Sequence, residues 1–373
     1  MRKMTYIHEL PNWPQFTWNQ DKLASKLADV RHRQGRLLGR MESLGFKLRN
    51  EAVLETLTLD VLKSSEIEGE ILNSDQVRSS IARRLGMDIA GAVAVDRDTE
   101  GVVEMMLDAT QKFDKSLSAE RLFGWHSALF PTGRSGIRKI IVGAWRSDAN
   151  GSMQVVSGPI GKQKLHYEAP AAHRLKAEMR QFTAWANKPG DTDPVFRAAL
   201  AHLWFVTIHP FDDGNGRIAR AIADWALARS ENSSQRFYSM SAQIRAERKA
   251  YYDILERTQK STLDVTDWME WFLDCLGRAI SGTELTLSAV LSKAQFWEKC
   301  AGKPISDRQK LMLNKLLDGF DGKLTSTKWA TIAKCSQDTA QRDIQGLIDQ
   351  GILTKDAAGG RSTSYSMVRS LLS

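Results

Sequence analysis

Most of the chain carries apolar residues at helical spacing, in which they recur every three or four positions. The ranges 21–48 and 50–69 show this pattern near the N-terminus, and the second ends in Gly69, a typical helix stop. The same spacing predicts further helices at residues 99–115, 118–130, 173–185, 194–207, 214–229, 244–259, 265–277 and 282–300. The pattern therefore predicts a mainly α-helical protein.

One stretch, residues 138–168, breaks the helical pattern. Residues 140–142 and 153–156 are apolar runs rich in β-branched side chains, and residues 148–151 between them favour a turn. These features predict a short β-hairpin. A departure from the surrounding pattern often marks a functional segment.

The C-terminal part, residues 304–373, has a pattern of its own. It predicts helices at residues 307–317, 328–334 and 336–348, a strand at 352–353, a turn at 359–361 and a strand at 363–367. This order of helices and a two-stranded wing resembles a winged helix. The third helix would present polar side chains suited to phosphates and base edges, namely Ser336, Gln337, Thr339, Gln341 and Arg342.

The candidate chemistry is concentrated in residues 209–220, which read HPFDDGNGRIAR. Apolar runs on both sides predict buried helices, so the Gly-Asn-Gly turn stands at the start of a helix. Free backbone N–H groups and the helix dipole favour a phosphate at such a place. Arg217 and Arg220 lie on one helical face and direct two guanidinium groups to the same region. The segment therefore predicts a phosphate site beside a histidine, His209.

Composition narrows the class of protein. A chain of 373 residues with 42% hydrophobic residues is expected to fold into two or three domains. The net charge of +8 suggests an anionic partner. Binding of ATP, binding of nucleic acid or solubility alone could each account for this charge. Three cysteines without metal-binding spacing suggest a reducing cytoplasm. We find no P-loop, dinucleotide or zinc pattern and no long apolar run, and we expect a soluble cytoplasmic protein without membrane contact.

The sequence of residues 209–220 resembles the Fic (Fido) family signature HPFx(D/E)GN(G/K)RxxR, and every defining position is matched. Further likeness covers residues 118–278, including the helix around Trp125 and His126 and the Tyr251-Tyr252 pair. The flap, a β-hairpin beside the family's active site, departs from the pattern: it ends in Glu-Ala-Pro instead of Pro-Pro, and its turn at 158–164 is rich in glycine and lysine. The resemblance implies a protein adenylyltransferase that moves AMP from ATP to a hydroxyl side chain of target proteins and of itself, with Mg²⁺ as cofactor.

The resemblance also implies a division of the chain and a fold. Residues 1–95 would form an N-terminal helical extension, 118–278 a helical Fic catalytic domain with a short β-hairpin flap, and 279–303 a helical linker. Residues 304–373 would form the winged helix. DNA is a possible partner of this last domain, and a homodimer is possible.

Roles at the site follow from the resemblance. The implied catalytic residues are His209 as general base, Asn215 and Arg217, and Asp213 would be the Mg²⁺ ligand, although it could equally be an N-cap. Arg217 would bind the α- and β-phosphates and Arg220 the γ-phosphate. The full ATP-binding set would be Val155, Val156, Ser157, Gly158, Gly214, Asn215, Gly216, Arg217, Arg220, Tyr252 and Gln259.

The segment around Ser64, Glu68 and Gly69 has two interpretations. It could be an ordinary charged helix end with a glycine stop. It also matches the family's inhibitory motif (S/T)xxxE(G/N), and Ser64 and Glu68 lie one helical turn apart on one face. In the second interpretation Glu68 pairs with Arg220 in place of the γ-phosphate of ATP.

Two other functions stay open at this point. The chain could be a DNA-binding regulator whose Fic core senses a nucleotide. It could instead be an enzyme that removes AMP from modified proteins, with Glu68 positioning a water molecule. The presence of His209 favours adenylyl transfer over the regulator.

Overall fold

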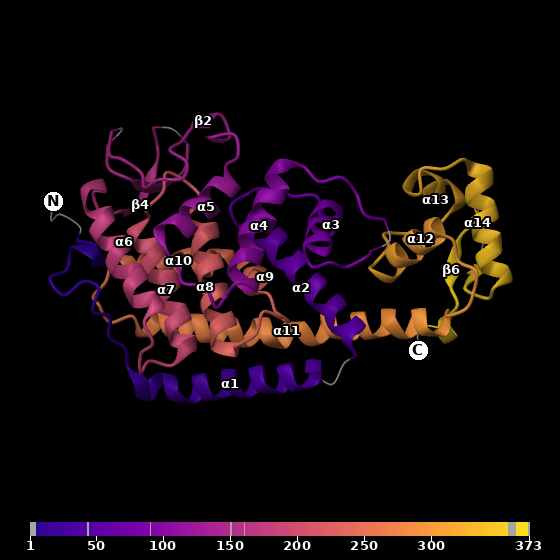
Figure 1. Ribbon diagram of the computed structural model, residues 1–373, viewed down its shortest axis with the longest axis horizontal. Helices are drawn as coiled ribbons and strands as arrows, with labels where there is room; N and C mark the ends of the chain where they lie inside the picture. The colour runs from indigo at the N-terminus through magenta and orange to yellow at the C-terminus, as the bar shows by residue number, and fades with distance from the viewer. Residues whose placement is uncertain are drawn as a thin grey trace.

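The computed structural model describes residues 5–42, 45–89, 91–149, 151–159, 161–356 and 363–371 (Figure 1). The predicted turn at 359–361 lies outside the described residues, as do Leu44 and Asn150 of the predicted helix and turn. Among the described residues, no helix is both long enough and apolar enough to span a membrane.

The described elements confirm the prediction of a mainly helical protein. The helices are η1 (Ile7–Glu9), α1 (Gln20–Glu42), α2 (Phe46–Ile67), α3 (Ser74–Arg84), α4 (Arg97–Gln111), α5 (Ala119–Leu129), α6 (Ala172–Asn187), α7 (Pro194–Ile208), α8 (Asn215–Glu231), α9 (Met240–Ala246), α10 (Arg248–Gln259), α11 (Thr266–Lys299), α12 (Asp307–Leu317), α13 (Ser326–Ile332), α14 (Gln337–Asp349) and η2 (Arg369–Leu371). The strands are β1 (Arg134–Ser135), β2 (Arg138–Lys139), β3 (Gln154–Ser157), β4 (Lys164–Glu168), β5 (Leu353–Lys355) and β6 (Tyr365–Met367).

Helices α7 and α8 form the centre of the main core. They pack against each other along their length, and side chains such as Leu203, Phe205 and Ile222 are fully buried between them and their neighbours. The segment that joins the two helices is the motif at 209–214. The core therefore holds this segment at both of its ends.

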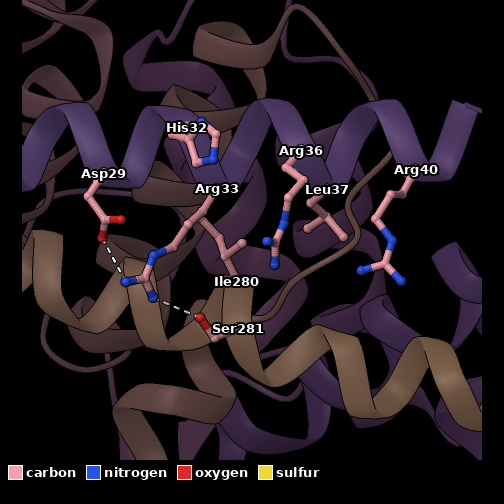
Figure 2. Close-up of a pocket in the computed structure, with 8 residues that line it drawn as sticks. All are labelled: Asp29, His32, Arg33, Arg36, Leu37, Arg40, Ile280 and Ser281. Carbon is pink, nitrogen blue, oxygen red and sulfur yellow. Dashed lines mark hydrogen bonds and ion pairs between the residues drawn. The ribbon is translucent and has the colours of Figure 1, made fainter.

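Helix α1 lies along α11 at the edge of the core (Figure 1). Its polar contacts include Lys26 to Asp274 at 2.7 Å and Arg33 to the Ser281 hydroxyl at 2.9 Å. A cavity of about 290 Å³ between the helices is lined by Asp29, His32, Arg33, Arg36, Leu37, Arg40, Ile280 and Ser281 (Figure 2). Arg33 also pairs with Asp29, which partly balances the basic lining.

The predicted hairpin pairs differently from the prediction. Strand β3 pairs antiparallel with β4, with Val155 opposite Tyr167, and the turn lies between residues 157 and 164. Residues 140–142 form no strand, because their backbone is used elsewhere: the Ile140 N–H donates to the Gly133 carbonyl and the Ile141 N–H to the Asp212 carboxylate. The predicted pairing of residues 140–142 with 153–156 was therefore wrong.

Several helices also differ from the prediction: the predicted helix at 21–48 ends at Glu42, and α2 begins at Phe46. Helix α3 was not predicted, because few of its residues are apolar; its N-cap is Asn73, whose side chain accepts from the Gln76 N–H. The predicted helix at 244–259 is divided into α9 and α10. The predicted break before Gly282 is absent, because α11 continues through it as one helix from the main core to residue 299.

The C-terminal part has a hydrophobic core of its own. Trp329, Ile344 and Leu347 from α13 and α14 are buried there, together with Phe296 from the end of α11. Strands β5 and β6 pair antiparallel after α14, and the Ser336 hydroxyl caps that helix by accepting from the Thr339 N–H. Assignment of this part as a DNA-binding winged helix stays a prediction.

Candidate functional site

The candidate site begins where α7 ends. His209 is the C-cap of α7 and has a left-handed backbone (φ 50°), which turns the chain sharply out of the helix. Its Nδ1 lies 3.2 Å from the Val206 carbonyl oxygen and donates to it, so Nε2 keeps its lone pair. Burial lowers the pKa of His209 to about 4. The imidazole is therefore neutral near pH 7 and can accept a proton at Nε2.

Arg146 holds the backbone of this turn. The side chain is almost fully buried, and its Nε donates to the His209 carbonyl at 2.8 Å. Its backbone N–H donates to the Pro210 carbonyl at 2.9 Å, and a third donor reaches the Pro170 carbonyl. These bonds fix the position of His209 from outside the motif.

The side chains of Phe211 and Asn215 close the loop on itself. Phe211 is fully buried and stacks on the ring of His126, with ring centroids 4.2 Å apart. The Asn215 amide accepts from the Phe211 N–H at 3.0 Å and donates to the Phe211 carbonyl at 2.8 Å. The side chain of Asn215 is therefore occupied in shaping the loop.

The N-terminus of α8 is open to a close anionic ligand. Gly214 precedes the helix with φ 78°, and a Cβ there would lie 2.9 Å from the Phe130 ring. A Cβ on Gly216 would lie 2.3 Å from a Glu68 carboxylate oxygen. The first N–H groups of a helix have no partner within it. Only glycine at 216 lets a carboxylate or a phosphate come this close to the helix.

Asp213 stands beside this helix end as a single carboxylate. It accepts from the Gly214 N–H at 2.6 Å and from the Ser135 hydroxyl, and it is partly exposed. Among the described residues, no cluster of three or more histidine, cysteine or acidic residues is placed to hold a metal. Magnesium sites commonly combine one or two carboxylates with substrate phosphates and water, which this arrangement fits.

Arg217 and Arg220 are both buried, and each contacts a carboxylate from the N-terminal part of the chain. The Arg217 guanidinium pairs with Glu70 at 2.5 Å and lies over the Phe130 ring. Its Nε is buried without a hydrogen-bond partner among the described residues. Arg220 pairs with Glu68 at 2.9 Å. Burial opposes the charged form of Arg220, but Glu68 raises its pKa above the ordinary value.

Successive turns of α2 contact successive turns of α8. Ser64 is fully buried, and it accepts from Arg220 through its hydroxyl at 3.0 Å and its carbonyl at 2.8 Å. One turn away on each helix, the Glu68 carboxylate covers Gly216. One turn before Ser64 on α2, Asp60 faces Asp224 on α8. Burial is the main cause that raises the pKa of Asp224 well above its usual value, and the negative charge of Asp60 adds to it. We call this row of contacts the α2–α8 seam.

Tyr252 on α10 also contacts Glu68. Its hydroxyl lies 3.5 Å from Glu68, its side chain is half-exposed, and the Arg248 guanidinium covers its ring. Arg248 also donates to the Ile67 carbonyl at 2.7 Å, which ties α10 to the end of α2.

Other predicted ATP-binding residues lie apart from the arginines. Gln259 is buried, and its amide donates to the Thr207 hydroxyl on α7. Residues 155–158 lie on or next to β3, where Ser157 contacts His166 on β4 at 2.6 Å. Among the described residues, neither Gln259 nor β3 has a hydrogen bond to the segment 209–220.

Several residues that shape the site were not predicted from the sequence. Glu70 lies just after the helix stop at Gly69, although a third acidic residue in the run from Glu66 is a visible sequence signal. Ser135 had no sequence signal. The contacts of Arg146 with the His209 turn emerge only in three dimensions.

Part of the chain is similar to a known protein family. The model of the Fic/DOC family matches residues 116–227, which run from the start of α5 to α8. The chain contains a Fic/DOC family domain. A second model, described only as a domain of unknown function (DUF4172), matches residues 6–87. The segment that contacts both arginines of the Fic domain lies within this second region.

Curated relatives match the chain over limited lengths. The "Protein adenylyltransferase Fic" of Culex quinquefasciatus is 31% identical over 113 residues, which is 30% of this chain and 21% of that protein. The "Uridine 5'-monophosphate transferase" of Xanthomonas campestris is 41% identical over 68 residues, or 16% of this chain and 12% of that protein. The chain thus spans about a fifth or less of the length of these two relatives.

A solved structure resembles nearly the whole chain. A Fic family protein from Desulfovibrio desulfuricans G20 covers 95% of this chain and 98% of its own, with a TM-score of 0.56 and 20% identity. At this identity the likeness establishes the fold. The helical fold with a small hairpin is therefore confirmed.

The seam predicts different costs for two neighbouring serines. Ser64→Ala removes an acceptor of the buried Arg220 Nε–H, and it should lower the free energy of unfolding by about 1–3 kcal/mol. Ser65→Ala is the matched control, because Ser65 is equally buried and its hydroxyl has no described partner. Urea denaturation measures both values. Equal losses would contradict the importance of the Ser64–Arg220 contact.

Proposed function

We propose that this protein is a protein adenylyltransferase that transfers AMP from ATP to a Ser, Thr or Tyr hydroxyl of target proteins and of itself. One arrangement supports the proposal above the others. A neutral histidine with a free Nε2 lone pair lies beside a helix N-terminus that carries two buried arginines. Such a site binds a polyphosphate and accepts a proton close to it. The relatives named adenylyltransferases carry the same type of domain.

The chemistry assigns a separate task to each group. His209 Nε2 removes the proton from the acceptor hydroxyl as its oxygen forms a bond to the α-phosphorus of ATP. The bond from the α-phosphorus to the bridging oxygen breaks, and pyrophosphate leaves with its electron pair. Arg217, Arg220 and the first N–H groups of α8 bind the phosphate oxygens. Asn215 holds the loop in shape through the Phe211 backbone.

The residues present fit a magnesium ion. Asp213 would hold Mg²⁺ together with phosphate oxygens, and the ion would neutralise part of the triphosphate charge. Ser135 and the Gly214 N–H orient the Asp213 carboxylate for this task.

Autoinhibition by the N-terminal part is the second half of the proposal. Glu68 pairs with Arg220 and covers Gly216. A bound γ-phosphate would have to contact the same two residues. Glu70 pairs with Arg217 in the same way. Each phosphate-binding arginine thus has a carboxylate from the N-terminal region as its partner. ATP must displace both carboxylates to reach a productive position.

Two other activities are kept as alternatives. One relative is named a uridine 5'-monophosphate transferase, so UTP is a second possible nucleotide donor. Removal of AMP from modified proteins would use Glu68 to position water, and the carboxylate is placed next to Gly216 and Tyr252. Both alternatives use the same phosphate site.

His209→Ala should lower AMP transfer by at least about a hundredfold, because the general base is lost while the arginines that bind ATP remain. The measurement follows transfer from ATP and UTP labelled at the α-phosphate.

Since the pKa of His209 is lowered to about 4, the base is already neutral at pH 6, and transfer should change little between pH 6 and 8. A variant that keeps most of the activity would contradict the assignment of the base.

Glu68→Gly should raise self-labelling, because Arg220 becomes available to ATP. Glu70→Gln should raise it less, because Glu70 is the more exposed carboxylate. Arg220→Ala should not activate, and Glu68→Gly combined with Arg220→Ala should resemble Arg220→Ala alone, since the two groups share one interaction.

Glu66→Gln is the control for these variants. Glu66 lies on the same helix, but it pairs with Lys63 and Arg245 and should leave activity unchanged. If Glu68→Gly binds ATP but is no more active than the wild type, residues 64–69 are an ordinary helix end.

The C-terminal part is proposed to bind DNA through α14. Gln341 and Arg342 on this helix are exposed, and the helix N-terminus is capped by Ser336. The full chain should retard a duplex in a gel at low salt and release it at high salt. Arg342→Glu should weaken this binding without changing self-labelling. No retardation at low salt would instead favour a protein contact or a homodimer through this part.

A further inference from the structure

Two β-hairpins flank the segment that carries His209 and Asp213. The β1–β2 hairpin is tied to it by the Ser135 hydroxyl, which donates to Asp213. The Arg146 segment, which leads into the β3–β4 hairpin, is tied to the carbonyls of His209 and Pro210. Both hairpins lie on the same face of the molecule, near the ends of α5 and α6 (Figure 1). These hairpins therefore border the segment that a target hydroxyl would have to reach.

The two hairpins carry more positive than negative charge. Residues 131–145 and 151–168 include five Lys or Arg residues and one acidic residue, Glu168 at the end of β4, which accepts a hydrogen bond from Gln154. All five are exposed, and they are Arg134, Arg138, Lys139, Lys162 and Lys164. Arg138, Lys139 and Lys162 have no acidic partner among the described residues, and Lys164 is 3.8 Å from Glu256. An anionic partner would meet a net positive charge here.

Apolar side chains are exposed between these charges. Ile137 at the tip of the first hairpin is 96% exposed. Val156 and Leu165 are cross-strand partners on the second hairpin, and both are about 40% exposed. Exposed apolar groups beside charged ones are typical of a surface that binds another protein.

The backbone of β3 adds a third feature. Among the described residues, strand β3 pairs with β4 alone, so its other edge is available to an extended chain. Such an edge recognises a peptide backbone by main-chain hydrogen bonds. This feature favours a polypeptide over a nucleic acid as the partner of the surface.

We propose that the two hairpins select target segments in which the acceptor hydroxyl is flanked by acidic side chains. The acidic residues of the target would pair with the five basic residues, and an apolar neighbour would contact Val156 and Leu165. The inference rests on the proposed function and specifies its substrate class.

Binding of short fluorescent peptides to the wild-type protein tests this proposal without catalysis. The peptides are identical except that a central threonine is flanked by Glu, Gln or Lys. The Glu peptide should bind about tenfold more tightly than the Lys peptide at low salt, as expected for several exposed ion pairs. High salt should reduce the difference. Equal binding of the Glu and Lys peptides would overturn the proposal.

Charge reversal locates the effect. Lys162→Glu combined with Lys164→Glu should reverse the preference, so that the Lys peptide binds more tightly. Lys112→Glu combined with Lys310→Glu is the control, because it changes the net charge equally at exposed positions on other elements. A reversal in the control as well would show that net charge alone acts, which overturns the proposal.

AMP transfer to the same peptides, measured in Glu68→Gly, separates the two proposals. The Glu peptide should have a lower KM than the Lys peptide, with a similar kcat. If no nucleotide is transferred to any peptide or to the protein itself, the proposed function fails, while the binding data still decide the docking surface. If duplex DNA displaces the Glu peptide more effectively than unlabelled peptide does, the surface binds nucleic acid and the proposal is wrong.

Discussion

A buried guanidinium needs a negative partner, and this requirement at Arg220 organises the structure. The side chain lies inside the α2–α8 seam, where it donates two hydrogen bonds to Ser64 and forms an ion pair with Glu68. Removal of one partner of a buried ion pair is costly. Arg220 therefore binds either the Glu68 carboxylate or an anion that replaces it. In the proposed function that anion is a phosphate of ATP, so inhibition and substrate binding compete for the same group.

The rest of the site is held by contacts from outside the motif and within it. Arg146 holds the backbone of the turn at His209, and His126 packs on Phe211 beneath the loop. Asn215 then closes the loop from within. A preorganised set of donors needs no rearrangement when charge develops in a transition state. In the proposed function the part that has to move is instead the end of α2, with the carboxylates that follow it.

The sequence predicted those parts of the site that depend on local spacing. The start of α8 and the shared face of Arg217 and Arg220 follow from local sequence patterns and helical spacing. The pairing of Glu68 with Arg220 was expected only from the resemblance of this segment to the family's inhibitory motif. The hairpin partner of β3 was mispredicted. Residues 140–142 have strand-like side chains, but the backbone N–H groups of Ile140 and Ile141 donate to the Gly133 carbonyl and the Asp212 carboxylate. Glu70 lies beyond the end of α2, where helical spacing no longer predicts direction, and only the three-dimensional structure shows it against Arg217.

The central claim is that Glu68 and the γ-phosphate of ATP exclude each other at Arg220. The most direct test is calorimetric binding of AMP, ADP and ATP, with Mg²⁺ present, to the wild type and to Glu68→Gly. The account predicts that the substitution tightens binding of ATP clearly more than binding of AMP, because only ATP places a phosphate at Arg220. Equal changes for all three nucleotides, or no change for ATP, would contradict it.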